Sequence, residues 1–211
     1  MVEITSTHVI KTFKHRNARM KVEHLETIYK LINDHSIPNT DRLVHVKDST
    51  IYLQPRGIAS HPGVVEELRQ CLKCILEALV VRIDISLIFE TSAHLVLVAH
   101  QIPLYHRDIR WENIIRRIED ESKWFLIDWE DAAMPPTSAA AQPFFTKETH
   151  SPAIFHDEHG PEVDIWAIGY LIRTSKALWR SVEMIRVGER ICEESRELSA
   201  QEVLVLLANS H

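Results

Sequence analysis

The chain has 211 residues, of which 45% are hydrophobic and 26% are charged, a composition typical of a folded globular protein with one large core or two small lobes. Its 30 acidic and 24 basic side chains give a formal charge of −6, which repels nucleic acid. Three cysteines are too few for a disulfide framework, and charged residues interrupt the most apolar stretch before it reaches the length of a membrane span. We therefore expect a soluble intracellular protein, cytoplasmic or nuclear, with no nucleic-acid or membrane partner.

The first 57 residues predict a small unit of strands and one helix. An apolar, β-branched stretch at 7–13 predicts a strand, and residues 42–46 and 50–54 predict a hairpin. Between them, residues 17–33 predict an amphipathic helix, because apolar side chains recur at steps of three and four. The side chains of this stripe are Val22, Leu25, Ile28, Tyr29 and Ile32. Residues 54–57, Gln-Pro-Arg-Gly, then interrupt the regular structure.

The rest of the chain is predicted to be mainly helical. Residues 64–81 carry an apolar stripe at helical spacing, within which Cys71 and Cys74 lie. Because no second cysteine pair or matched histidine pair follows, this C-x-x-C predicts a thiol pair in or beside the core rather than a redox or zinc site. Ser199 and Glu202 predict a capping box. The remaining predicted elements are strands at 113–118 and 124–128, a long surface loop at 131–155, and helices at 163–176, 177–194 and 199–207.

Side chains that carry chemistry gather in and after a loop at residues 105–113. Its sequence, Tyr-His-Arg-Asp-Ile-Arg-Trp-Glu-Asn, places the carboxylate of Asp108 five residues before the carboxamide of Asn113. Fifteen residues after Asn113, an apolar strand ends on a second carboxylate, Asp128. Phosphoryl transfer needs such a set, with one carboxylate for the proton of the attacking hydroxyl and an oxygen-rich pair for Mg²⁺.

The pattern His-Arg-Asp-x-x-x-x-Asn, followed by an Asp at a strand end, resembles the catalytic loop of eukaryotic-type protein kinases, and the chain has a general likeness to kinase-like proteins of fungi. The resemblance implies ATP and Mg²⁺ as cofactors and a protein Ser/Thr-type hydroxyl as the acceptor. The residue roles that it implies are Asp108 as the catalytic carboxylate, Arg110 as its electrostatic aid, Asn113 and Asp128 as Mg²⁺ ligands, Lys11 as the phosphate clamp, and Glu26, or alternatively Glu23, as the ion-pair partner of Lys11.

Motifs further along the chain extend this resemblance. Residues 164–169, Asp-Ile-Trp-Ala-Ile-Gly, resemble the D-x-W-x-x-G motif whose Asp ties down the catalytic loop, and residues 151–153, Ser-Pro-Ala, stand in the place of A-P-E. The expected fold class is therefore α+β, a protein-kinase-like two-lobed fold with a truncated N-lobe at 1–57 and a mainly helical C-lobe at 58–211. Residues 82–98 are expected to form an insertion in the C-lobe.

Two departures from the kinase pattern keep other functions open. No glycine precedes the Val-Ile-Lys strand, and ten residues precede Lys11, so we expect the chain to lack the Gly-rich loop that covers ATP in kinases. This departure favours a catalytically impaired kinase-like module that binds or regulates. Where kinases have D-F-G, the chain has Asp128-Trp129-Glu130, which resembles small-molecule phosphotransferases of the aminoglycoside and choline kinase type.

Other polar and aromatic groups have less specific interpretations. Arg107 fits either a phosphate group from the long loop or hydrogen bonds to nearby carbonyls, while His106 and Asp164 are predicted to be structural. The histidines and acids at 150–159 lack a recognised metal-ligand spacing, which disfavours zinc. The tryptophans are predicted to anchor the core, and they are Trp111, Trp124, Trp129, Trp166 and Trp179.

Overall fold

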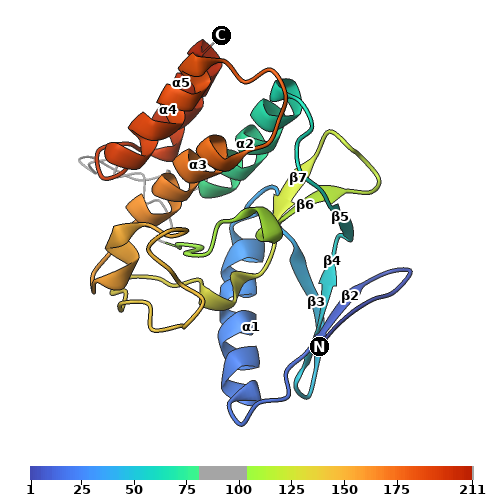
Figure 1. Cartoon of the computed structure of the whole chain (residues 1–211). Helices are drawn as coiled ribbons and strands as arrows, with labels where there is room; N and C mark the ends of the chain where they lie inside the picture. Colours follow the sequence, from blue (N-terminus) through green and yellow to red (C-terminus); the bar gives the residue numbers. More distant parts are fainter. Residues whose placement is uncertain (81–103, 211) are drawn as a thin grey trace, which may run out of the picture.

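The structure is a computed structural model that describes residues 1–80 and 104–210 (Figure 1). Within these residues the chain forms five α-helices and two small antiparallel sheets, so the predicted α+β class is confirmed. The insertion predicted at 82–98 lies outside the described residues. None of the helices in the described part of the chain is long and apolar enough to cross a membrane.

The N-terminal sheet has four antiparallel strands in the order β1-β2-β4-β3. Its strands are β1 (Val2–Ile4), β2 (Val9–Thr12), β3 (Arg42–Lys47) and β4 (Thr50–Gln54). Helix α1 (Ala18–Asp34) packs against β3 and buries the predicted apolar stripe, which stabilises a helix more than its intrinsic propensity does. The strand, helix and hairpin predicted here are confirmed, whereas β1 was not predicted because three residues are too few to show a periodic pattern.

The second sheet has the order β5-β6-β7, also antiparallel. Its strands are β5 (Gly57–Ala59), β6 (Ile114–Arg117) and β7 (Trp124–Leu126). Strands β6 and β7 confirm the two strands predicted around residue 120, while β5 was not predicted and only its first residue, Gly57, lay in the predicted breaker. The chain crosses from one sheet to the other between the end of β4 and the start of β5 (Figure 1). A division into domains at residue 57 stays a prediction.

The remaining helices lie beside the second sheet (Figure 1). They are α2 (Val65–Leu79), α3 (Glu162–Thr174), α4 (Val182–Glu193) and α5 (Ala200–Asn209). Helix α2 packs against β7 and α5, and α3 packs against α4. Three short 3₁₀ helices are η2 (Trp111–Asn113), η3 (Trp129–Asp131) and η4 (Pro152–Phe155). The loop between η3 and η4 contains no α-helix or strand, as predicted.

Side-chain caps decide where two of these helices begin. Helix α4 starts at Val182, later than the predicted residue 177, because Ser181 accepts a hydrogen bond from the backbone N–H of Met184 at 3.1 Å and caps the helix there. The capping box predicted for α5 is confirmed. The backbone N–H of Ser199 donates to Oε2 of Glu202 at 2.7 Å, and that of Glu202 donates to Oγ of Ser199 at 3.3 Å.

One apolar core joins both sheets and all five helices. Cys71 and Cys74 are buried in it as free thiols, which confirms their predicted place. Trp124 and Trp129 are buried in the same core. Trp179 is 79% exposed, so the prediction that every tryptophan anchors the core is wrong for this residue, which lies on the connection between α3 and α4.

Helices α3 and α4 approach so closely that a side chain does not fit between them at Gly169. A Cβ atom on Gly169 would lie 2.6 Å from the carbonyl oxygen of Gly188 and 2.9 Å from the backbone nitrogen of Cys192. These are backbone atoms, which cannot move aside by changing a rotamer. The close contact therefore requires glycine.

Gly169→Ala is expected to lower the free energy of unfolding by about 1 to 3 kcal/mol, because its Cβ overpacks the contact between α3 and α4. Urea denaturation followed by circular dichroism measures the change. Gly63→Ala is the matched control, since a Cβ there meets only the Glu67 side chain at 3.5 Å, and its effect is expected to stay within about 1 kcal/mol. Equal stability of the two variants would contradict the close contact.

Candidate functional site

A buried carboxylate at the start of α3 holds the loop that carries the predicted catalytic residues. Asp164 accepts hydrogen bonds from the backbone N–H groups of His106 and Arg107, each at 2.8 Å. Burial raises the pKa of Asp164 above its ordinary value, although the charge of His106 and these two N–H groups oppose the rise. The tie predicted between Asp164 and the loop is therefore present.

Asp108 is the second buried carboxylate of this loop, with 3% of the residue exposed. The carboxamide of Asn113 donates to its Oδ2 at 2.8 Å, and Nε2 of His150 lies 3.0 Å from its Oδ1. Nε of Arg110 lies 3.2 Å from the same Oδ1 but without the alignment of a hydrogen bond. The structure thus brings Asp108, Arg110 and Asn113 together as predicted, and it adds His150 from the long loop.

Asn113 connects Asp108 to the end of β7. Its Nδ2 donates to both the backbone oxygen and the Oδ2 of Asp108 at 2.8 Å. Its own backbone oxygen accepts a hydrogen bond at 3.0 Å from the N–H of Ile127, the residue that precedes Asp128. The β6–β7 pairing therefore carries Asn113 and Asp128 to the same end of the second sheet.

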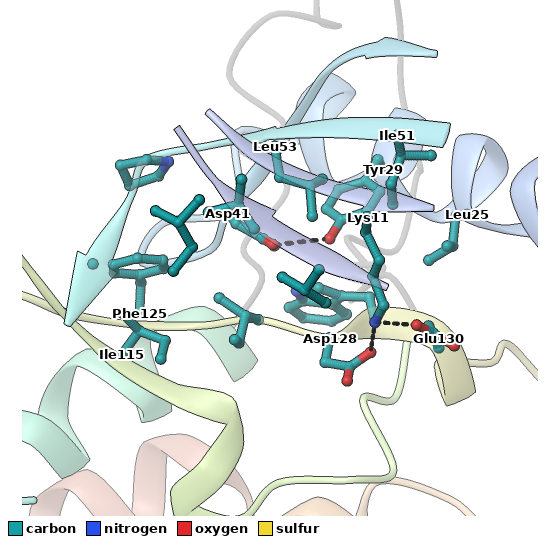
Figure 2. Close-up of a pocket in the computed structure, with 17 residues that line it drawn as sticks. Lys11, Leu25, Tyr29, Asp41, Ile51, Leu53, Ile115, Phe125, Asp128 and Glu130 are labelled. Carbon is teal, nitrogen blue, oxygen red and sulfur yellow. Dashed lines mark hydrogen bonds and ion pairs between the residues drawn. The ribbon is translucent and has the colours of Figure 1, made fainter. Parts of the chain in front are cut away.

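Asp128 meets Lys11 of the first sheet, as Figure 2 shows. The Lys11 ammonium donates to Oδ1 of Asp128 at 2.9 Å and also pairs with Glu130. Glu130 pairs in turn with Lys21 of α1. Asp128 has a left-handed backbone with φ 67°, which is uncommon outside glycine and often marks functional sites. Two lysines and two carboxylates thus form one charged cluster, which connects β2 and α1 to the segment that follows β7.

The ion pair predicted between Lys11 and Glu26, or alternatively Glu23, is not formed among the described residues. Both glutamates are exposed on α1. The helix turns Leu25 and Tyr29 inward, and Glu26 and Glu23 lie one and two positions from Leu25, spacings at which helical side chains do not share a face. The carboxylates of residues 128 and 130 take the place that was predicted for a glutamate of α1.

Charge and burial act in opposite directions on this ion pair. Burial favours a higher pKa for Asp128, but the charge and hydrogen bond of Lys11 outweigh it, and the pKa lies below its ordinary value. Burial likewise favours a lower pKa for Lys11, and the carboxylates of Asp128 and Glu130 outweigh it and raise that pKa. Both groups are therefore charged at neutral pH.

A mainly apolar cavity of about 190 Å³ lies between the two sheets, beside this ion pair. Figure 2 shows Lys11, Asp128 and Glu130 together at one side of it. Its apolar lining comes from both sheets and from α1, and includes Val9, Leu25, Ile51, Leu53, Ile115 and Phe125. A cavity with an apolar body and a charged side suits a ligand with an apolar part and an ionic part.

Asp41 and Tyr29 form a second polar pair in the lining of this cavity, which the sequence did not indicate. The Tyr29 hydroxyl lies 3.0 Å from both carboxylate oxygens of Asp41 (Figure 2). Burial raises the pKa of Asp41 to about 7, although the hydrogen bond from Tyr29 opposes the rise. No local spacing relates the two residues, because Tyr29 lies within α1 and Asp41 just before β3.

His106 and Arg107 have structural contacts on either side of the loop. Nε2 of His106 donates to the backbone oxygen of Ile127 at 3.0 Å. The guanidinium of Arg107 donates to the backbone oxygens of Asp131 at 3.1 Å and Ser138 at 2.8 Å. Of the two interpretations of Arg107, the structure therefore has the one in which it bonds to carbonyls.

No group of three or more histidine, cysteine, aspartate or glutamate side chains in the described part of the chain is arranged to hold a metal ion. His150, which the sequence suggested only as a weak zinc ligand, contacts Asp108 instead. Its role in the site was missed because its contact to the loop at 105–113 is purely tertiary.

No protein-family model matches the chain. A search of curated proteins found similarity to Crinkler effector protein 8 of Phytophthora infestans, with 36% identity over 156 residues. The aligned region covers 72% of this chain and 23% of that relative. The chain therefore spans less than a quarter of the length of the curated relative that it matches.

The raised pKa of Asp41 predicts a specific pH dependence of stability. Because its pKa is about 7 in the folded chain and about 4 when unfolded, the folded chain holds a proton that the unfolded chain releases between these values. The free energy of unfolding is therefore expected to fall as pH rises from about 4 to 7, by at most about 4 kcal/mol. Asp41→Asn should remove this part of the slope. Urea denaturation at several pH values measures this slope. If the free energy of unfolding has the same pH dependence in the original chain and in Asp41→Asn across that range, the prediction is contradicted.

Proposed function

We propose that the chain transfers the terminal phosphoryl group of ATP, with Mg²⁺, to a hydroxyl group of a protein. One observation carries the proposal, namely that Asp108, Asn113 and Asp128 converge at one end of the second sheet and that Lys11 reaches them from the first. Phosphoryl transfer depends on positioning and charge stabilisation, for which these groups are suited. The proposal includes a protein-kinase-like two-lobed fold with lobes at 1–57 and 58–211.

The cavity between the sheets supports the nucleotide part of the proposal. Its apolar lining fits the faces of a purine ring, and Lys11 provides a cation at its charged side, toward which phosphate oxygens would point. Lys11 is held there by Asp128 and Glu130. The same ammonium can bind phosphate oxygens in place of one carboxylate.

The chemistry of Asp128 and Asn113 fits Mg²⁺, which prefers oxygen ligands and keeps several waters. The Nδ2 of Asn113 is occupied by Asp108, so the Oδ1 of the same carboxamide faces away from Asp108 and is the atom left for a cation. Asp128 would supply the charged oxygen. When bound, Mg²⁺ offsets the negative charge of the phosphate groups.

Asp108 would act on the acceptor. Its buried carboxylate would orient the incoming hydroxyl and take up its proton, and the nearby guanidinium of Arg110 would stabilise negative charge on the transferred group. The two hydrogen bonds from Asn113 and His150 leave about two of the four lone-pair positions of the carboxylate for that hydroxyl.

Phosphorylation of a small molecule is the second candidate function. The observation that favours it is that the carboxylate of Glu130 forms ion pairs with both Lys11 and Lys21. The Asp-Trp-Glu sequence that resembles aminoglycoside- and choline-type phosphotransferases is thus part of the site. The two candidates differ in the acceptor and share the nucleotide chemistry.

Asp128→Asn is expected to abolish the part of ATP binding that depends on Mg²⁺, because an amide lacks the charge that attracts the cation. Calorimetric titration of ATP with and without Mg²⁺ measures this part. Glu26→Gln is the matched control, since Glu26 is exposed and not paired with Lys11, and it should bind like the original chain. Equal binding by the original chain and Asp128→Asn would remove Asp128 from the metal site, and a lack of binding by both would favour a kinase-like module without nucleotide.

Asp108→Asn is expected to lower turnover by roughly 10²- to 10⁴-fold with ATP affinity nearly unchanged, because the amide loses the basicity of the carboxylate. Lys11→Ala should weaken both ATP binding and turnover, since its ammonium contacts the phosphates. The turnover of both variants is measured by radiolabelled phosphate transfer to a mixed protein substrate and to a panel of amino alcohols and aminoglycosides, and their ATP affinity by calorimetry. Transfer to small molecules alone would favour the second candidate. An original chain that binds ATP but transfers nothing would contradict both enzyme functions.

A further inference from the structure

His150, in the long loop before η4, has both ring nitrogens in hydrogen bonds although only 5% of the residue is exposed. Nε2 lies 3.0 Å from Oδ1 of Asp108. Nδ1 lies 2.9 Å from the hydroxyl of Thr149 and accepts from the backbone N–H of Thr146 at 3.4 Å. A buried imidazole with partners on both sides has a defined orientation.

The hydrogen-bond partners of the ring assign its tautomer. A backbone N–H can only donate, so the N–H of Thr146 requires that Nδ1 of His150 carries no hydrogen. The hydrogen of a neutral imidazole is then on Nε2, which donates it to Asp108. The hydroxyl of Thr149 donates to the same bare Nδ1, and its oxygen lies 2.9 Å from the hydroxyl of Thr146.

Packing holds the ring of His150 in this position. Its centroid lies 4.5 Å from that of Phe145, a buried side chain of the same loop. Phe145 belongs to a small apolar cluster of its own with Ala153, Ile154 and Val163. The loop therefore has a packed interior, and His150 is the side chain through which this interior reaches Asp108.

Without His150, the carboxylate of Asp108 would keep the hydrogen bond from Asn113 to Oδ2, while Oδ1 would be left, among the described residues, with the guanidinium of Arg110. That guanidinium is not aligned for a hydrogen bond. One donor on one oxygen leaves the carboxylate free to rotate about its bond to Cβ. Two donors, one on each oxygen, fix its plane.

We propose that His150 is a positioning residue that fixes the carboxylate plane of Asp108 and thereby couples the conformation of the loop at 131–155 to phosphoryl transfer. The inference rests on the proposed function, because it assigns His150 a part in that reaction. His150 does not touch the acceptor or the nucleotide. It acts by donating a hydrogen bond to the carboxylate that receives the acceptor hydroxyl.

Two substitutions of His150 separate the hydrogen bond from the packing. His150→Phe keeps a ring beside Phe145 but cannot donate, so turnover is expected to fall by about 10- to 100-fold, as for a misplaced catalytic group, with the KM for ATP unchanged. In His150→Gln the Nε2 of the carboxamide can donate from nearly the same place, and most of the turnover should return. His156→Phe is the matched control, because His156 is an exposed histidine of the same segment, and its turnover should equal that of the original chain.

The same variants define the results that would overturn the inference. Turnover of His150→Phe equal to that of the original chain would show that the hydrogen bond is not needed, and higher turnover would show that His150 obstructs Asp108. Equal losses in His150→Phe and His150→Gln, with unchanged melting temperatures, would also contradict it. An original chain that transfers no phosphate would instead remove the proposed function.

Nuclear magnetic resonance of the imidazole gives a readout that does not depend on activity. In the nucleotide-free chain, long-range ¹H–¹⁵N spectra should show His150 with a protonated Nε2 and a bare Nδ1, and its Nε2–H proton should shift in Asp108→Asn. The signal is assigned by its absence in His150→Gln. A protonated Nδ1 with a bare Nε2, or a signal that Asp108→Asn leaves unchanged, would show that His150 does not hold Asp108.

Discussion

The candidate site depends on the buried carboxylate of Asp164, which accepts the backbone N–H groups of His106 and Arg107. Buried N–H groups without hydrogen-bond partners cost free energy. In this buried loop the two N–H groups have no acceptor in the described backbone of a neighbouring strand or helix, and the carboxylate of Asp164 accepts them instead. Because α3 carries this carboxylate, the helix sets the place of the whole loop. The side chains of Asp108 and Asn113 then need only short-range contacts to reach their positions.

A second constraint joins the two sheets through charge. Lys11 comes from β2 and Asp128 follows β7, so their ion pair spans the cavity side of both sheets. Glu130 and Lys21 extend the pair to α1. Burial opposes the charged state of Lys11 and Asp128, and the attraction between the two groups, with that of Glu130 for Lys11, outweighs it. A ligand with anionic groups would compete for the same lysine, so that binding there would redistribute charge between the two sheets.

The long loop between η3 and η4 is attached to the site at two points. Arg107 donates to the carbonyl oxygen of Ser138 near its beginning, and His150 contacts Asp108 near its end. The apolar cluster around Phe145 gives the loop an interior of its own. Loops of this length in compact proteins are often functional, and here His150 places the loop in direct contact with the buried carboxylate of Asp108.

The sequence by itself determined the elements whose patterns are local. The apolar stripe of α1, the strands β2, β3, β4, β6 and β7, the capping box of α5 and the grouping of Asp108, Asn113 and Asp128 around one hairpin all follow from periodicity or spacing over fewer than about 25 residues. Strands β1 and β5 have three residues each and are defined only by their pairing partners. Local patterns are readable because a residue and its neighbours on the same element have fixed geometry.

Only the tertiary structure decided which charged groups meet. Glu26 has the spacing from Lys11 that the resemblance to kinases implies, yet the rotation of α1 turns Leu25 and Tyr29 inward and leaves Glu26 exposed. Glu130 pairs with Lys11 across more than a hundred residues, and the contacts of Asp41 with Tyr29 and of His150 with Asp108 arise in the same way. Charge pairing depends on distances of a few ångströms between side chains, and these distances are set by the packing of elements on one another, which no spacing along the chain encodes.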